Sequence, residues 1–294
     1  MDFRPGVKVQ YTEISIAPAL FLWETQTMQM ILLAVLGFCA LVASAQEKHE
    51  IPDDLLDTEH FRSDSALNEF TVPSISKVFN ELEKVSPLSY DPNHYKNYGR
   101  TPIDRSRIAL RLGTLIADGF IAVQTGNSED VPKIAAHISR YSKALGAGDK
   151  IKVHAAELLE HAKAKDLPKL KRALASTQRD VELELAGLRD PDLSHLISLG
   201  GWLEALDSAA TAINKKYTPE RALTLFREDV ADYYAESIGS LHPDISRRPH
   251  LIKMRELLQG LRNAMVLKEN STPSAVQVKE VTTVSSQLVE IARR

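Results

Sequence analysis

The spacing of apolar residues is the feature that most constrains the fold of this chain. Between Pro73 and Leu267 they recur at every third or fourth position almost throughout, which places them on one face of an α-helix. No stretch shows the strict alternation that is typical of a half-buried strand, and β-branched residues concentrate only in the tail from Lys268 to Arg294. The sequence therefore predicts an all-α fold, a bundle of about eight antiparallel helices.

Capping residues, prolines and glycines set the expected helix boundaries. Ser128 and Pro132 are expected to begin one helix and Gly146 to end it, because short polar side chains cap helix N-termini and glycine suits a left-handed C-terminal residue. Asp190-Pro191 and Thr218-Pro219 mark two further starts. The helix that follows Asp166 is expected to bury five residues, namely Leu170, Leu174, Val181, Leu185 and Leu188.

The N-terminal region contains an export signal. An apolar run from Ile31 to Val42 ends in Ala43-Ser44-Ala45, which is typical of a signal peptide cleaved after Ala45. The run is too short to cross the ~30 Å hydrocarbon core of a bilayer comfortably. We therefore expect a periplasmic or secreted protein without stable membrane insertion after cleavage. The alternative is a membrane anchor through residues 25–46, all of which are uncharged.

The chain divides into five expected segments. Residues 1–27 are interpreted as an over-extended gene start because the basic residue nearest upstream of the apolar run is Lys8, and Met28 is a better start. Residues 28–45 form the signal peptide, 46–72 a polar leader, and 73–267 the helical domain. Residues 268–294 form a tail that is either disordered or one amphipathic helix. Cys39 is the single cysteine and would be removed with the signal peptide, so no disulfides are expected.

Composition excludes one class of partner. Hydrophobic residues make up 44% of the chain and charged residues 26%, with a net charge of -3. A chain of this length can bury one large core without disulfides. The charge balance argues against the broad basic surface that nucleic-acid binding requires.

Small residues predict a close contact between two helices. Ala109, Gly113 and Ala117 are four residues apart on one helix, and Gly201, Ala205 and Ala209 repeat that spacing on another. A glycine inside a helix costs ~1 kcal/mol relative to alanine, so the adjacent pair Gly200-Gly201 needs a compensating contact, a bend or a ligand. We favour packing, with Trp202 as a core residue, and keep Gly200, Gly201 and Trp202 as ligand-binding candidates.

The same helices carry a faint internal repeat. A shift of 87 positions superposes six identical residues, which pair as Leu112/Leu199, Gly113/Gly200, Ala122/Ala209, Asn127/Asn214, Pro132/Pro219 and Ala135/Ala222. Two explanations account for these matches equally well: duplication of a helical hairpin, or the glycines and prolines that unrelated helical hairpins also share.

Ionisable residues supply the remaining candidates. Asp118 interrupts an apolar run, and Arg111, two turns earlier on the same helix face, is expected to form a buried ion pair with it. We add both residues to the ligand-binding candidates. His154, Glu157 and His161 share a helix face and are weak metal candidates, because no second helix supplies matching ligands. No metal and no cofactor are therefore expected.

Three acids on another helix, Asp229, Asp232 and Glu236, share a face that is able to perform acid–base chemistry if burial separates their pKa values. No Gly-x-Ser-x-Gly motif and no cysteine–histidine pairing provides a nucleophile.

Two segments resemble a known group of proteins. Both segments are similar to exported bacterial all-helical proteins of unassigned function. The first, residues 112–120, contains Leu112-Gly113 and Leu115-Ile116-Ala117-Asp118-Gly119-Phe120. The second, residues 196–203, reads Leu196-Ile197-Ser198-Leu199-Gly200-Gly201-Trp202-Leu203. The resemblance spans residues 107–261. It implies a bacterial envelope location and identifies no catalytic residue.

Together these features predict an exported helical binding or interaction module, with an unknown protein or a small ligand as its partner and no identifiable catalytic site. The alternative is an enzyme or metal-binding protein that uses the His154/Glu157/His161 face or the Asp229/Asp232/Glu236 face.

Overall fold

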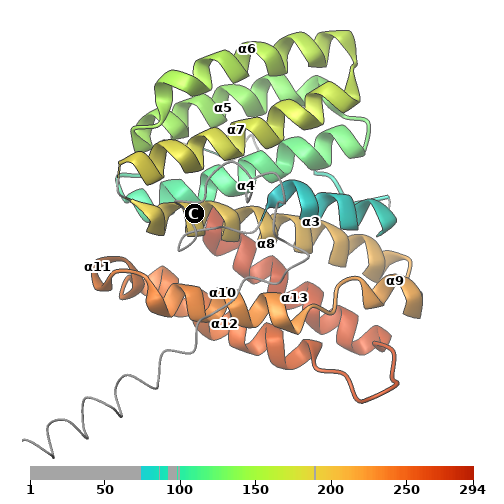
Figure 1. Cartoon of the computed structure of the whole chain (residues 1–294). Helices are drawn as coiled ribbons and strands as arrows, with labels where there is room; N and C mark the ends of the chain where they lie inside the picture. The colour runs from blue at the N-terminus through green and yellow to red at the C-terminus, as the bar shows by residue number, and fades with distance from the viewer. Residues whose placement is uncertain (1–73, 86, 92–97, 99, 189) are drawn as a thin grey trace, which may run out of the picture. The chain divides into compact units, whose positions relative to one another are not determined.

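The computed structural model describes residues 74–85, 87–91, 98, 100–188 and 190–294. Within these ranges every regular element is helical and none is a strand, which confirms the all-α prediction (Figure 1). The predicted gene start, signal peptide and polar leader lie outside the described residues. The elements are α3 (Ile75–Leu82), η3 (Glu83–Val85), α4 (Arg105–Gln124), η5 (Ser128–Asp130), α5 (Val131–Leu145), α6 (Gly148–Ala164), α7 (Leu167–Gly187), α8 (Pro191–Lys215), α9 (Pro219–Leu223), α10 (Glu228–Ser240), α11 (Pro243–Ser246), α12 (Pro249–Met265) and α13 (Ala275–Arg293).

Local capping chemistry fixes most of the helix ends. Asp104 begins α4 by accepting a hydrogen bond from the Ser106 backbone N–H, and Thr218 caps α9 in the same way. Gly146 ends α5 with φ 93°, in the left-handed conformation that glycine adopts without steric cost. The prediction for Ser128 is wrong, because this residue lies within the 3-10 turn η5 and makes no capping hydrogen bond to α5.

The helices form two groups that meet along α4 and α8 (Figure 1). On one side, α5 and α7 pack on α4, and α6 packs on both α5 and α7. On the other side, α13 packs on α8, α12 packs on α13, and α10 packs on α12. The short helix α3 lies on α8. An arrangement of two helical groups around a paired α4 and α8 is compatible with duplication, although the sequence repeat itself remains faint.

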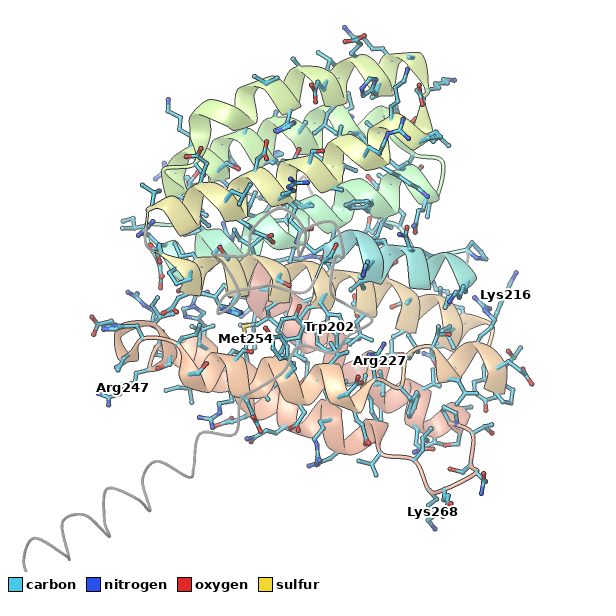
Figure 2. All side chains as sticks on the ribbon, in the orientation of Figure 1. Trp202, Lys216, Arg227, Arg247, Met254 and Lys268 are labelled. Carbon is cyan, nitrogen blue, oxygen red and sulfur yellow. The ribbon has the colours of Figure 1, made fainter. Side chains whose placement is uncertain are left out.

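Side chains sort between interior and surface as the periodicity predicts. Trp202 and Met254 are buried, whereas Lys216, Arg247 and Lys268 are exposed (Figure 2). One exception is Leu188, which was expected beneath α7 but is 53% exposed. It follows the last helical residue of α7, Gly187, so the helical period no longer directs its side chain towards the core.

The α4–α8 contact is as close as the small residues predict. A Cβ atom added to Gly113 would lie 1.9 Å from the Ile197 carbonyl oxygen, and one added to Gly200 would lie 2.2 Å from the Leu110 carbonyl oxygen. Both distances are far below van der Waals contact, so only glycine allows the two backbones to approach this closely. A Cβ on Gly201 would instead meet the Ile75 side chain at 2.1 Å. On α8 it is therefore Gly200, rather than Gly201, that admits the α4 backbone.

These two glycine contacts are related by the 87-residue shift. Leu110 and Ile197 are 87 positions apart, as are Gly113 and Gly200, so each glycine receives the carbonyl three residues before its counterpart. The crossing therefore has a local two-fold character, and the repeat coincides with the closest contact between the two helical groups.

The tail is an integral part of the bundle. It forms α13, which begins with a capping box between Ser274 and Gln277. The apolar face of α13 buries Val278, Val281 and Leu288. Of the two alternatives for residues 268–294, the amphipathic helix is therefore correct. Within the described part of the chain, none of the helices combines the length and hydropathy that a membrane span requires.

Candidate functional site

Two carboxylic acids lie buried at the α4–α8 contact. Asp118 of α4 is 1% exposed and Glu204 of α8 is 2% exposed. Both interrupt apolar stretches of the helices that carry them. Buried acids are rare unless they are paired, because transfer of a carboxylate out of water is costly. Asp118 and Glu204 therefore need a partner within the core.

The cation of the cluster comes from α13. The Arg293 guanidinium hydrogen-bonds to Glu204 Oε1, and its Nη2 lies 3.9 Å from Asp118 Oδ1. The predicted ion pair between Asp118 and Arg111 is therefore wrong. Arg111 lies on the same helix as Asp118, but its guanidinium is held by the main-chain oxygen of Arg294 and by the Tyr141 hydroxyl at 3.2 Å.

Burial dominates the electrostatics of the acid pair. It raises the pKa of Asp118 to about 6, against the opposing effects of the Arg293 charge and of hydrogen bonding with Glu204 and Tyr98. It also raises the pKa of Glu204 well above its usual range, and the Asp118 charge adds to that increase. Since two carboxyl groups share one guanidinium, we assign one proton to the pair near neutral pH, which leaves the cluster electrically neutral.

Burial alone would lower the pKa of the Arg293 guanidinium, but Glu204 and Asp118 raise it beyond its usual value. Arg293 therefore stays charged at any pH at which the acid pair titrates.

Tyr98 and Thr114 close the cluster from another side. The two hydroxyl groups are 2.6 Å apart, and the Tyr98 ring packs edge-on against Tyr141 at 6.2 Å between ring centroids. Burial raises the pKa of Tyr98 well above its usual value, and the charges of Asp118 and Glu204 contribute to the shift. Tyr98 therefore remains a neutral hydrogen-bonding group beside the acids.

The other predicted ligand-binding residues, Gly200, Gly201 and Trp202, make packing contacts in the core. Gly200 and Gly201 face Leu110 and Ile75, as described above, and Trp202 is 5% exposed. The Trp202 ring packs on Tyr234 with 5.1 Å between centroids. This arrangement agrees with the packing interpretation of these three residues.

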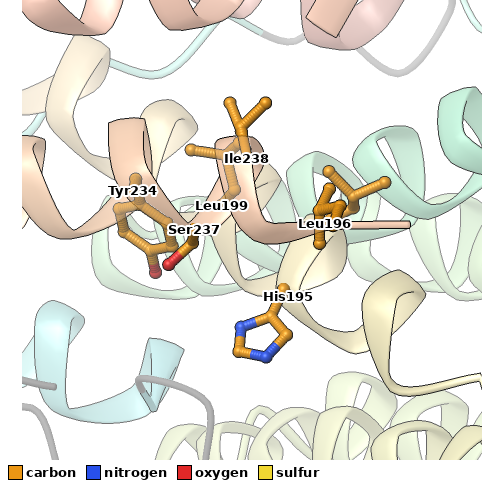
Figure 3. A pocket seen from close by; sticks show the side chains of 7 residues that line it. His195, Leu196, Leu199, Tyr234, Ser237 and Ile238 are labelled. Atoms are coloured by element: carbon orange, nitrogen blue, oxygen red, sulfur yellow. The ribbon is translucent and has the colours of Figure 1, made fainter. Parts of the chain in front are cut away.

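A shallow depression lies between α8 and α10, and Tyr234 forms part of its wall. It contains about 160 Å³ of space, open solvent included, and its interior is too narrow for a water molecule. Figure 3 shows its side chains, which are His195, Leu196, Leu199, Tyr234, Ser237, Ile238 and Leu241. The His195 Nδ1 lies 3.4 Å from the Tyr233 hydroxyl, and burial lowers the pKa of His195. The depression is therefore apolar, with a neutral imidazole and a serine hydroxyl at its wall.

The predicted metal face is only partly assembled. His154 Nε2 lies 2.6 Å from Asp180 Oδ2 of α7, and its Nδ1 lies 3.3 Å from Glu157 Oε2. His161, in the last turn of α6, lies near Asp166 instead. No group of three or more metal-ligand side chains is found among the described residues. His154 instead links α6 to α7 through Asp180, while Glu157 belongs to the same helix as His154.

The acids of α10 do not act together. Asp229 pairs with Arg227 at 2.7 Å, and Asp232 lies 3.5 Å from Arg262. Glu236 is exposed. Hydrogen bonding with Arg227 lowers the pKa of Asp229, which is the opposite of the increase that a general acid at neutral pH requires.

The structure also brings together a serine and a histidine that sequence reasoning missed. Ser106 Oγ lies 3.1 Å from His250 Nε2, although the two residues are 144 positions apart. The Ser106 hydroxyl donates to Asp104 Oδ1 at 2.6 Å, so its proton is directed away from the imidazole. Burial lowers the pKa of His250 to about 4, and the Arg107 charge adds to the effect. Arg248 also binds Asp104 at 2.8 Å, so this cluster fastens the start of α12 to the start of α4.

Comparison with other proteins gives no family for this chain. No protein-family model, curated protein or solved structure matches it.

Proposed function

We propose that this chain is an exported helical binding module rather than an enzyme. The observation that supports this proposal is the use of its ionisable residues. The acid pair is matched with Arg293, His154 bridges two carboxylates, and Asp229 is matched with Arg227. The acid pair, His154 and Asp229 therefore each take part in an ion pair or hydrogen bond within the protein.

The depression between α8 and α10 is the place where we expect a ligand. Binding sites for small molecules are mostly apolar, with a few polar groups that orient the ligand. Leu196, Leu199 and Ile238 supply apolar walls. His195 and Ser237 would have to exchange their contacts with the Tyr233 hydroxyl for contacts with the ligand. The depression as it stands is too narrow for a ligand, so α8 and α10 must separate slightly to admit a short alkyl chain or one side chain of a partner.

The location belongs to the same proposal. Residues 28–45 have the pattern of a signal peptide, and the resemblance to exported bacterial helical proteins points the same way. A periplasmic or secreted location is therefore part of the proposed function.

The test uses two short-chain probes, 1-hexanol and hexanoate. Saturation-transfer NMR should detect both probes on the full-length mature protein, and Ser237→Leu, which fills the depression, should abolish the signal. Ser240→Leu is the matched control, because it makes the same change on an exposed position of α10. Equal signals for the wild type and Ser237→Leu would exclude this site.

Native mass spectrometry of the protein as purified addresses the wider proposal. A co-purified small molecule or protein would support a binding module. About one equivalent of zinc or iron, lost in His154→Ala, would instead favour the metal-binding alternative.

A further inference from the structure

The α13 helix is attached to the bundle by two kinds of interaction. Along its middle, Ser285 and Ser286 donate hydrogen bonds to Asp207 Oδ1 at 3.0 and 2.6 Å. At its C-terminal end, Arg293 enters the acid pair, and the main-chain oxygen of Arg294 receives Arg111. The apolar face, which includes Leu288, Val289 and Ala292 near the C-terminal end, holds α13 at any pH, and charges add to the attachment of that end.

The titratable groups around Arg293 belong to α4, to α8 and to the segment before α4. Asp118 belongs to α4, Glu204 and Asp207 belong to α8, and Asp91 and Tyr98 precede α4. Arg293 is the cation that α13 contributes to this group, and Arg111 of α4 lies beside the Arg294 backbone. With one proton on the acid pair, the charges of Asp118, Glu204 and Arg293 sum to zero. Without that proton they carry one net negative charge in a buried site that Asp207 and Asp91 make more negative.

We infer that Asp118, Glu204 and Arg293 form a proton-dependent latch, which holds the C-terminal end of α13 on α4 and α8 while the acid pair carries a proton and releases that end when the proton is lost. Release would bring both carboxylates into contact with water. The latch is independent of the proposed ligand site, which lies between α8 and α10.

The direction of the pH dependence follows from linkage. In the closed state burial raises the pKa of both acids, whereas in the open state they meet water and return towards ordinary values. The closed state therefore binds more protons. Acid favours the closed latch, and a rise in pH favours the open one, by about tenfold per pH unit for each proton released on opening.

Hydrogen–deuterium exchange of the full-length mature protein between pH 6 and pH 9 tests this inference. After correction for intrinsic exchange, amides at residues 287–293 should exchange faster as pH rises, by up to about tenfold per unit. Amides of α5 and α6 should show no such trend, because they lie outside the latch. No trend in residues 287–293, or the same trend in all helices, would overturn the inference.

Two variants remove the titration without removing the side chains. Glu204→Gln keeps the size and hydrogen-bonding capacity of residue 204 but leaves Asp118 as the single acid facing Arg293. Its α13 exchange should vary less than about twofold over the same range once the linked proton is absent. Asp118→Asn provides the second test if Glu204→Gln does not fold. Glu290→Gln is the matched control, because Glu290 lies on α13 and pairs with Arg294 at the surface.

The control should keep the wild-type trend. A trend that persists in both Glu204→Gln and Asp118→Asn would assign the pH dependence to other groups and refute the latch.

Discussion

Gly113→Ala is the most direct test of the α4–α8 contact. The new Cβ would lie 1.9 Å from the Ile197 carbonyl oxygen and 2.8 Å from the Gly201 nitrogen. Ordinary contact begins near 3.4 Å, so the two backbones must separate by about 1.5 Å at this point. Backbone atoms cannot move aside by changing rotamer, so the whole crossing must shift.

Two opposing effects determine the expected size of the change. Overpacking of a tight core contact typically costs ~1–3 kcal/mol, and a backbone clash belongs at the upper end of that range. Replacement of a helical glycine by alanine returns up to ~1 kcal/mol. We therefore expect Gly113→Ala to lose about 2 kcal/mol, which corresponds to a melting temperature lower by roughly 4–8 °C for a domain of this size.

Gly260→Ala is the matched control within the same chain. Gly260 lies inside α12, and a Cβ added there meets nothing within 4 Å. The same substitution should therefore stabilise the protein by up to ~1 kcal/mol. Gly201→Ala should have a smaller effect than Gly113→Ala, because it meets the flexible end of the Ile75 side chain.

Thermal and urea unfolding of these three variants, monitored by circular dichroism, provide the measurement. A Gly113→Ala protein that unfolds at or above the wild-type midpoint would refute the close-contact argument. The glycines of α4 and α8 would then become the first candidates for a ligand site.

Three further predictions concern processing, metal content and pH. When the chain is expressed with its signal peptide in a bacterium, N-terminal sequencing should show that the mature protein begins at Gln46. An intact N-terminus in the membrane fraction would instead favour the membrane anchor through residues 25–46. Elemental analysis of protein purified without chelators should find no stoichiometric transition metal, and His154→Ala should lower stability by loosening α6 from α7. Because the folded pKa of Asp118 is raised to about 6, its contribution to stability is complete below its unfolded pKa and is lost as pH rises through 6. Between pH 4 and pH 7 the free energy of unfolding of the wild type should therefore fall by about 2 kcal/mol relative to Asp118→Asn, and equal pH profiles would contradict this.

Local chemistry explains what could be predicted from the sequence. The helical period, the cap at Thr218 and the glycine stop at Gly146 depend on residues within one or two turns, so the sequence already contains them. The error at Ser128 has the same local character, because a capping residue and a 3-10 turn use the same short polar side chains. The small residues likewise predicted a close helix contact.

Partners from distant segments could not be predicted in this way. Asp118 was identified because apolar residues surround it in the sequence, and apolar residues also flank Glu204 in its own helix. Nothing in the sequence indicates that the two acids face each other. Arg111 was the nearest cation along the helix, yet Arg293 reaches the acids from α13, 175 residues beyond Asp118. The sequence alone determined which helices form and which of their faces are apolar, because those properties depend on neighbouring residues. Tertiary structure alone decided which charges meet, because a buried acid is stabilised by whichever cation the packing of the helices brings within reach.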